Sequence, residues 1–116
     1  MHDREIYAVL KDLGVPTHLK GYKCTVLAVS DVLEHPEHMD GLVQEVYGSV
    51  AKTIGGGATP ARVERAIRHA ISYVFLNTES AVLERYFGHM IRYKDGKVTN
   101  KCFIANIAEC IRMKEV

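Results

Sequence analysis

The sequence predicts an all-α protein, a compact bundle of about six helices that contains a helix-turn-helix. Apolar residues recur at intervals of three and four through most of the chain, which is the period of an amphipathic helix. Glycine and proline residues divide the chain into helix-sized pieces, and no internal repeat interrupts them. The alternation of apolar and polar residues that is typical of a strand occurs in one short segment.

The composition is that of one ordinary globular domain, which we expect to span residues 1–116. Apolar residues make up 47% of the chain and charged residues 25%, proportions that exclude a mainly disordered protein. No apolar run approaches the roughly 20 residues of a membrane span, and the N-terminus lacks the features of a signal peptide. The three cysteines have no metal-binding spacing, so we interpret them as reduced thiols of a cytoplasmic protein.

The net charge is close to zero. Fifteen Lys and Arg residues against fourteen Asp and Glu residues give +1 at pH 7. The charge of the whole chain therefore does not indicate a polyanionic partner. Any such partner must be met by a local patch of basic residues.

The first two helices are predicted over residues 4–13 and from residue 17 or 18 to residue 33. The first ends at Gly14, in the position of a C-terminal cap. Gly21 weakens the second helix, because glycine is a poor helix former, and Pro36 lies just beyond its end. Their core-facing residues are Ile6, Val9, Leu10, Leu13, Leu19, Tyr22, Val26, Leu27 and Val29.

A third helix is predicted over residues 40–54 and a fourth from residue 60 to about residue 76. The third has a strong amphipathic repeat and ends at the triple glycine of residues 55–57. Thr59 then follows as an N-cap, with Pro60 at the first helical position, where a missing N–H costs nothing. Residues 40–76 thus follow the plan of a helix-turn-helix, in which the second helix enters the DNA major groove.

Two shorter elements complete the prediction, a helix over residues 79–87 that ends at Gly88 and a last helix over residues 100–113. Between them, residues 90–99 alternate about an Asp-Gly pair, which predicts a two-stranded hairpin. A lone hairpin is only marginally stable without a sheet to join, so an irregular loop is an equal alternative.

The fourth predicted helix carries the clearest functional pattern. At about 100° per residue, its apolar positions fall on one arc and its basic positions on the opposite one. An arginine fork can donate two hydrogen bonds to guanine, and a carboxylate can accept one from cytosine. The pattern alone leaves a merely solvated face as an equal alternative. The basic arc consists of Arg62, Arg65, Arg68 and His69, and Glu64 lies among them.

Three sequence segments and their order along the chain carry a resemblance to a known family. They are Gly14-Val15-Pro16-Thr17-His18-Leu19-Lys20-Gly21-Tyr22, Arg62-Val63-Glu64-Arg65-Ala66-Ile67-Arg68-His69-Ala70-Ile71, and Thr99-Asn100 with Phe103-Ile104-Ala105. With them the chain resembles the C-terminal DNA-binding effector domain of the stage-zero sporulation master response regulator of bacteria. The resemblance extends from about Ile6 to Ile111.

The resemblance implies a domain of about six helices, whose third and fourth form the helix-turn-helix, and a loop rather than a wing before the last helix. It implies base contacts from the start of the recognition helix, which fall on Arg62, Glu64 and Arg65, with Arg68 and His69 also facing DNA. The family recognises boxes resembling TGTCGAA, often in tandem, with two domains side by side. We add Thr59, at the start of that helix, and Lys52, as a phosphate contact, to the expected DNA-binding residues.

The sequence departs from the family pattern at three places. The turn at residues 55–58 is about two residues longer, and its triple glycine predicts flexibility, so that the pitch of the recognition helix could differ. Ala61 stands where a serine is usual, which removes one hydrogen bond to phosphate or base. Members also carry an N-terminal phosphoacceptor receiver domain, which is absent from this sequence, as in an excised fragment or a stand-alone version.

Other chemistries are weaker predictions. His35 and His38, with Glu34 and Glu37 alongside, surround Pro36 without a third spaced ligand, so a solvated loop is favoured over a metal site. No nucleophile motif or phosphate-binding glycine loop accompanies His69, so we expect no enzymatic activity. No cofactor is expected either.

The predicted function is that of a sequence-specific regulator of transcription that binds double-stranded DNA. Its expected partners are TGTCGAA-like duplexes, a second copy of the chain on tandem boxes, and RNA polymerase. The alternative is a protein-interaction module of the same fold that has lost DNA binding and modulates a full-length regulator. The near-neutral charge and the glycine-rich turn favour the alternative, whereas the set of Arg62, Glu64, Arg65 and Arg68 favours DNA binding.

Overall fold

The computed structural model describes residues 3–88 and 98–114, and every element among them is helical. The predicted all-α class is therefore confirmed. The elements are α1 (Asp3–Leu13), α2 (Lys20–Glu34), η1 (Pro36–Gly41), η2 (Leu42–Tyr47), α3 (Gly48–Ile54), α4 (Pro60–Asn77), α5 (Ser80–Phe87) and α7 (Asn100–Lys114). Over the same residues, no helix has the length and apolar character needed to cross a bilayer.

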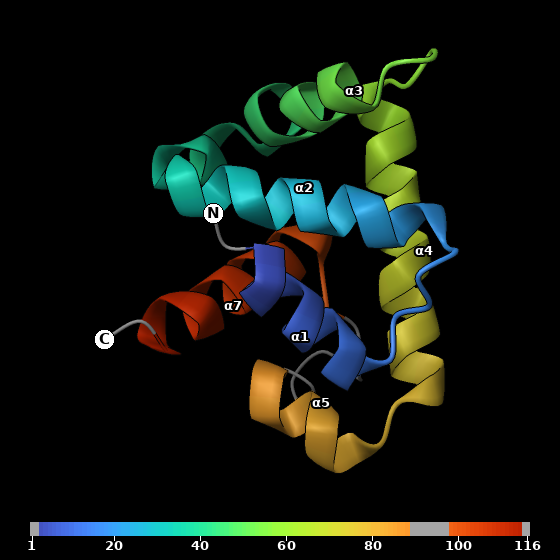
Figure 1. Cartoon of the computed structure of the whole chain (residues 1–116), viewed down its shortest axis with the longest axis vertical. Coiled ribbons are helices and arrows are strands. Elements are labelled where there is room, and N and C mark those ends of the chain that lie inside the picture. The colour runs from blue at the N-terminus through green and yellow to red at the C-terminus, as the bar shows by residue number, and fades with distance from the viewer. Residues whose placement is uncertain (1–2, 89–97, 115–116) are drawn as a thin grey trace.

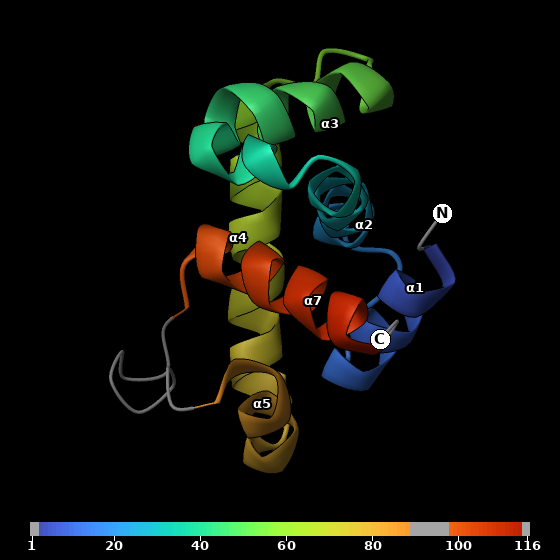
Figure 2. The same ribbon diagram turned by 90° about the vertical axis from the view of Figure 1, so that its left-hand side faces the viewer.

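Helix α4 runs along the long axis of the molecule, and α2 crosses it near its middle (Figure 1). Helix α3 packs at the N-terminal end of α4, while α5 packs on α1 and α7. Figure 2 shows that α7 approaches α4 from the side, next to the crossing with α2. Because α2 contacts α1, α4 and α7, it forms the centre of the bundle. The core around it includes Ile6, Leu10, Val29, Tyr47, Ile67, Ile71, Phe103 and Ile107, all fully buried.

The helix predicted over residues 40–54 is confirmed as helical from Leu42 to Ile54, but it is not one regular α-helix. The chain instead forms a 3-10 helix, then the π-helix η2, and only then a short α-helix, α3. Gly41, with φ −131° and ψ 59°, lies outside helical geometry and separates η1 from the helical run that begins at Leu42. The turn of the π-helix η2 is wider than that of an α-helix, and its adjacent residues Val46 and Tyr47 are both buried. In a regular α-helix, the side chains of adjacent residues point in directions about 100° apart.

Smaller differences concern the ends of elements. Helix α2 begins at Lys20, later than predicted, because the Leu19 N–H bonds to the Pro16 carbonyl (3.2 Å) in a separate turn. The loop predicted around Pro36 is in fact η1, which begins at that proline. Most of the hairpin predicted over residues 90–99 lies outside the described residues, and the two that are described, Val98 and Thr99, belong to no regular element.

Gly21 lies buried where α2 crosses α4, which explains its presence inside a helix. A Cβ atom at this position would lie 2.7 Å from the Cβ of Ala70 and closer still to the carbonyl oxygen of Ala66. Real Cβ contacts are essentially never that short. The two helix backbones therefore approach more closely at this point than any other residue would allow.

Tyr86 connects α5 to α1 and makes the stability of the fold depend on pH in the alkaline range. Its hydroxyl donates to Asp12 Oδ2 at 2.7 Å. Burial, and then this hydrogen bond, raise the pKa of Tyr86 to about 12. A raised pKa stabilises the fold fully below pH 10, the ordinary value for tyrosine, and this contribution is lost as the pH rises from 10 toward 12.

We expect Tyr86→Phe to lower the free energy of unfolding by about 1 kcal/mol at neutral pH, because one hydrogen bond is lost. The variant should also lose less stability than the parent between pH 10 and pH 12. Urea denaturation at a series of pH values measures both effects. Parallel pH profiles for parent and variant would contradict this assignment.

Candidate nucleic-acid interface

The start of α4 has the capped geometry that the sequence predicts. Thr59 is extended, at φ −130° and ψ 160°, and its side-chain oxygen accepts a hydrogen bond from the Arg62 N–H at 3.2 Å. Pro60 is the first helical residue. This cap fixes where the helix begins and therefore which side chains its first two turns present to solvent.

The two faces of α4 are separated as predicted. The inward face is buried and consists of Val63, Ile67, Ala70, Ile71 and Val74, with Ala66 half-buried beside them. All seven residues expected to bind DNA are exposed: Lys52, Thr59, Arg62, Glu64, Arg65, Arg68 and His69. Six of the seven lie between the N-cap and the middle of α4, at residues 59–69, whereas Lys52 is in the last turn of α3.

The structure brings three of these residues together with the N-terminal end of α2. A surface hollow is lined by Arg62, Arg65 and His69 on one side and by His18 and Lys20 on the other. A neighbouring hollow adds Lys23, again opposite Arg62. The side chains that line the two hollows include five basic or imidazole groups around Arg62 and no carboxylate.

Sequence reasoning did not assign a role to His18, Lys20 or Lys23. Their position beside α4 depends on the close crossing at Gly21, a contact between segments far apart in the chain. One local signal was available, because Lys20 and Lys23 are three residues apart and so lie on the same side of α2.

The other flank of α4 is fixed by the N-terminal end of α7. Arg68 Nη2 donates to the carbonyl oxygen of Val98 at 2.7 Å, and Asn100 Nδ2 donates to the backbone carbonyl of Glu64 at 2.9 Å. A third hollow lies here, lined in part by Glu64, Arg65 and Lys101. Arg68, predicted only as a DNA-facing residue, thus also connects α4 to the segment before α7.

Tyr47 forms the floor of this third hollow. Its side chain is fully buried, and burial raises the pKa of its hydroxyl. The hydroxyl faces the Asn100 amide but makes no hydrogen bond of acceptable geometry with any described residue. We assign Tyr47 to the packing of η2 under α4 rather than to the exposed interface.

The turn before α4 is defined by its backbone and not by side chains. Gly55, Gly56 and Gly57 have φ values of 68°, 59° and 85°, in the region that favours glycine. The Ala58 N–H closes the turn by bonding to the Gly55 carbonyl at 3.1 Å. An alanine substitution stabilises a flexible turn only where the glycine has ordinary backbone angles. None of these three glycines has such angles, so we expect no alanine substitution here to be stabilising.

We expect Gly55→Ala to lower the free energy of unfolding by about 1–3 kcal/mol, because φ 68° with ψ −158° is a combination essentially confined to glycine. Nothing lies within 4 Å of the added Cβ, so the cost is one of backbone strain alone. Urea denaturation measures it. A variant more stable than the parent would mean that the turn relaxes freely in solution.

The arrangement as a whole is an exposed helix start that carries arginine and glutamate, flanked on one side by cations of α2. A comparison with known families covers nearly the whole chain. Residues 6–111 of the 116 match the family described as the C-terminal part of the sporulation initiation factor Spo0A.

Proposed function

Because the chain belongs to the Spo0A C-terminal family, whose members are DNA-binding domains of a sporulation transcription factor, we propose that it is a sequence-specific transcriptional regulator that reads double-stranded DNA with α4. The family is not one of enzymes. Helices α3 and α4 with the turn between them would act as the helix-turn-helix, and the recognised sequence would be a TGTCGAA-like box.

The observation that carries this proposal is the exposure of Arg62, Glu64 and Arg65 on the first two turns of α4. The N-terminal residues of a recognition helix are those that reach base edges in the major groove. Arginine pairs with two acceptors of guanine, and a glutamate accepts from the amino group of cytosine, so the three side chains suit a box with G·C pairs. Thr59 and His69 border this set on the same exposed surface.

The cations of α2 would contact the DNA backbone. Lys20, Lys23 and His18 line the hollows beside Arg62, and lysines at such positions neutralise phosphates without reading sequence. Lys52 would do the same from α3. The near-neutral chain thereby gains a local basic surface beside α4, so a net charge of +1 does not argue against DNA binding.

Arg68 would have two functions. One of its terminal nitrogens is bonded to Val98, which holds α7 against α4. A guanidinium has five N–H donors, so others remain for a phosphate. We propose that Arg68 orients the recognition helix and also contributes to binding.

Fluorescence anisotropy with a labelled TGTCGAA duplex and a scrambled duplex tests the proposal. We expect tighter binding to the box, weakened at higher salt because phosphate contacts release counterions. A duplex with two tandem boxes should bind two copies of the chain, and contact with RNA polymerase would follow on a promoter. Failure to bind either duplex would favour the protein-interaction module.

Two substitutions separate reading of bases from attraction to phosphate. Glu64→Ala removes a negative charge, so we expect stronger binding to the scrambled duplex and a lower preference for the box. Lys52→Ala should weaken binding to both duplexes alike and reduce the dependence on salt. Titrations of both variants at one fixed salt concentration measure the ratio of the two affinities, and titrations of Lys52→Ala at several salt concentrations measure the dependence on salt. An unchanged ratio in Glu64→Ala would assign Glu64 a structural role.

A further inference from the structure

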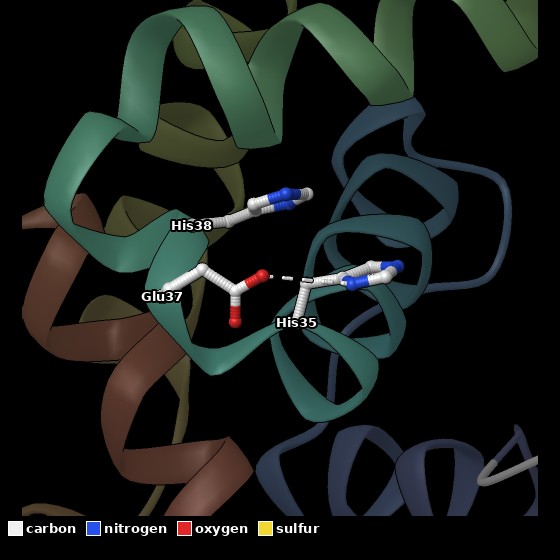
Figure 3. Close-up of side chains that lie close together, drawn as sticks. All are labelled: His35, Glu37 and His38. Carbon is white, nitrogen blue, oxygen red and sulfur yellow. Dashed lines mark ion pairs between the residues drawn. The ribbon is translucent and has the colours of Figure 1, made fainter.

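A cluster of histidine and carboxylate side chains lies where α2 passes into η1, on a part of the chain that the proposed DNA interface does not use. We name His35, Glu37 and His38 the junction cluster. One ligand atom from each of them lies within 4.8 Å of those of the other two. Figure 3 shows the Glu37 carboxylate and the two imidazoles gathered on one side of this junction.

We propose that the junction cluster binds a divalent transition-metal ion of the Zn²⁺ class. Two imidazoles and a carboxylate are a ligand set that zinc accepts, with water in the remaining position. The sequence interpretation of this segment assumed that a third ligand was missing. Glu37, named there only as a neighbour of the histidines, supplies that ligand, because the turn of η1 brings its carboxylate oxygen within 3.8 Å of His35 Nδ1.

Asp31 supports the proposal from outside the cluster. Its carboxylate accepts a hydrogen bond from His38 Nδ1 at 2.8 Å, and both side chains are largely buried. Metal-binding histidines almost always donate their second N–H in this way, which fixes the tautomer and orients the ring. The free nitrogen of His38 is then Nε2, which lies 3.7 Å from Glu45 Oε2 and could gain Glu45 as a further ligand.

The present spacing calls for a small adjustment. Zinc–ligand distances near 2.1 Å place the ligand atoms of a tetrahedral site about 3–3.5 Å apart. His35 and Glu37 are exposed and can rotate toward the ion, whereas His38 is held by Asp31. The rings of His35 and His38 already lie stacked, with centroids 4.7 Å apart. Metal binding would therefore move exposed side chains and leave the helices in place.

Binding would join His35, the C-cap of α2, to Glu37 and His38 of η1. Asp31 belongs to α2, Glu37 and His38 to η1, and Glu45 to η2. An ion that binds the folded chain and not the unfolded chain raises the stability of the fold by mass action. Zinc should accordingly raise the midpoint of thermal unfolding in proportion to the logarithm of its concentration.

Calorimetric titration of the full chain with Zn²⁺ tests the proposal, run slightly above neutral pH because the hydrogen bond to Asp31 raises the pKa of His38. We expect one ion per chain. His35→Asn and Glu37→Gln should each lower the affinity at least tenfold, and Asp31→Asn should lower it about 10–100-fold. The control Glu79→Gln, at an exposed carboxylate outside the cluster, should leave the affinity unchanged.

His35 and Glu37 are exposed, so loss of the fold cannot account for their effect, and far-UV circular dichroism checks this. Co²⁺ supplies a second readout, because cysteine ligation gives an intense sulfur-to-metal absorption band and histidine ligation does not. Equal zinc affinity in His35→Asn, Glu37→Gln and the parent would overturn the proposal. A sulfur-to-cobalt band would also overturn it, since the ion would then be bound by a thiol.

Discussion

Gly21→Ala should destabilise the domain by about 3 kcal/mol or prevent it from folding. The added Cβ would lie 2.7 Å from the Cβ of Ala70 and even closer to the Ala66 carbonyl oxygen. A helix backbone cannot yield as a flexible side chain can, so α2 and α4 would have to separate. The core residues on both sides of the crossing would then lose contact. Urea denaturation followed by circular dichroism measures the change.

Gly48→Ala is the matched control, since it makes the same chemical change in another helix. Gly48 has ordinary helical angles, φ −62° and ψ −43°, and the nearest atom to an added Cβ is 3.8 Å away. We expect this variant to be more stable than the parent by about 0.5–1 kcal/mol, because alanine is the better helix former. If both variants behaved alike, the close approach at Gly21 would not be a constraint in solution.

Arg65→Ala should lower affinity for the TGTCGAA duplex by about 1–3 kcal/mol, which corresponds to about 5- to 150-fold. Its effect on a scrambled duplex should be much smaller, because a lost guanine contact removes discrimination. Arg65 is well placed for this test, as it lines the hollows on both flanks of α4 and its side chain is exposed. Arg62→Ala should behave in the same way. Anisotropy titrations at fixed salt measure both.

Arg85→Ala controls for the loss of one positive charge. Arg85 belongs to α5, outside all the basic hollows around α4, and its only recorded ion pair among the described residues is with Asp12 at 4.0 Å. We expect a small change that is equal on both duplexes. If Arg65→Ala lost affinity equally for box and scrambled DNA, Arg65 would attract the DNA electrostatically and would not read its bases.

The helices whose apolar residues repeat without interruption could be predicted from the sequence. In α4, the buried and exposed faces follow from the repeat, and Thr59 and Pro60 mark the start. The division of residues 36–54 into η1, η2 and α3 could not be predicted, because the apolar spacing of residues 40–54 also fits a single α-helix. In the folded chain η2 packs against α4, Val46 and Tyr47 are buried, and Gly41 has non-helical angles, and none of these features can be derived from the spacing of apolar residues alone.

The candidate sites, too, could be predicted from the sequence only where they depend on a single helix. The exposed face of α4 was predicted, since it depends on the period of one helix. Lys20 and Lys23 were not, because they reach that surface only through a contact between two helices distant in sequence. Gly21 was interpreted as a weakness of its helix for the same reason. A close helix crossing favours glycine. From one sequence, a glycine needed for such a crossing cannot be distinguished from a glycine that merely weakens its helix.

The close crossing also determines how the molecule can respond to a partner. Where side chains separate two helices, changes of rotamer let the helices slide and roll by small amounts. At Gly21 the backbone of α2 lies directly against the Ala66 carbonyl and the Ala70 methyl group of α4. No side chain with rotamers lies between the two helices there, so such small movements are restricted. We therefore expect helices α2 and α4 to move together. If the chain binds DNA as proposed, we expect any adjustment on binding to occur in the glycine turn and α3, which lie beside this pair of helices.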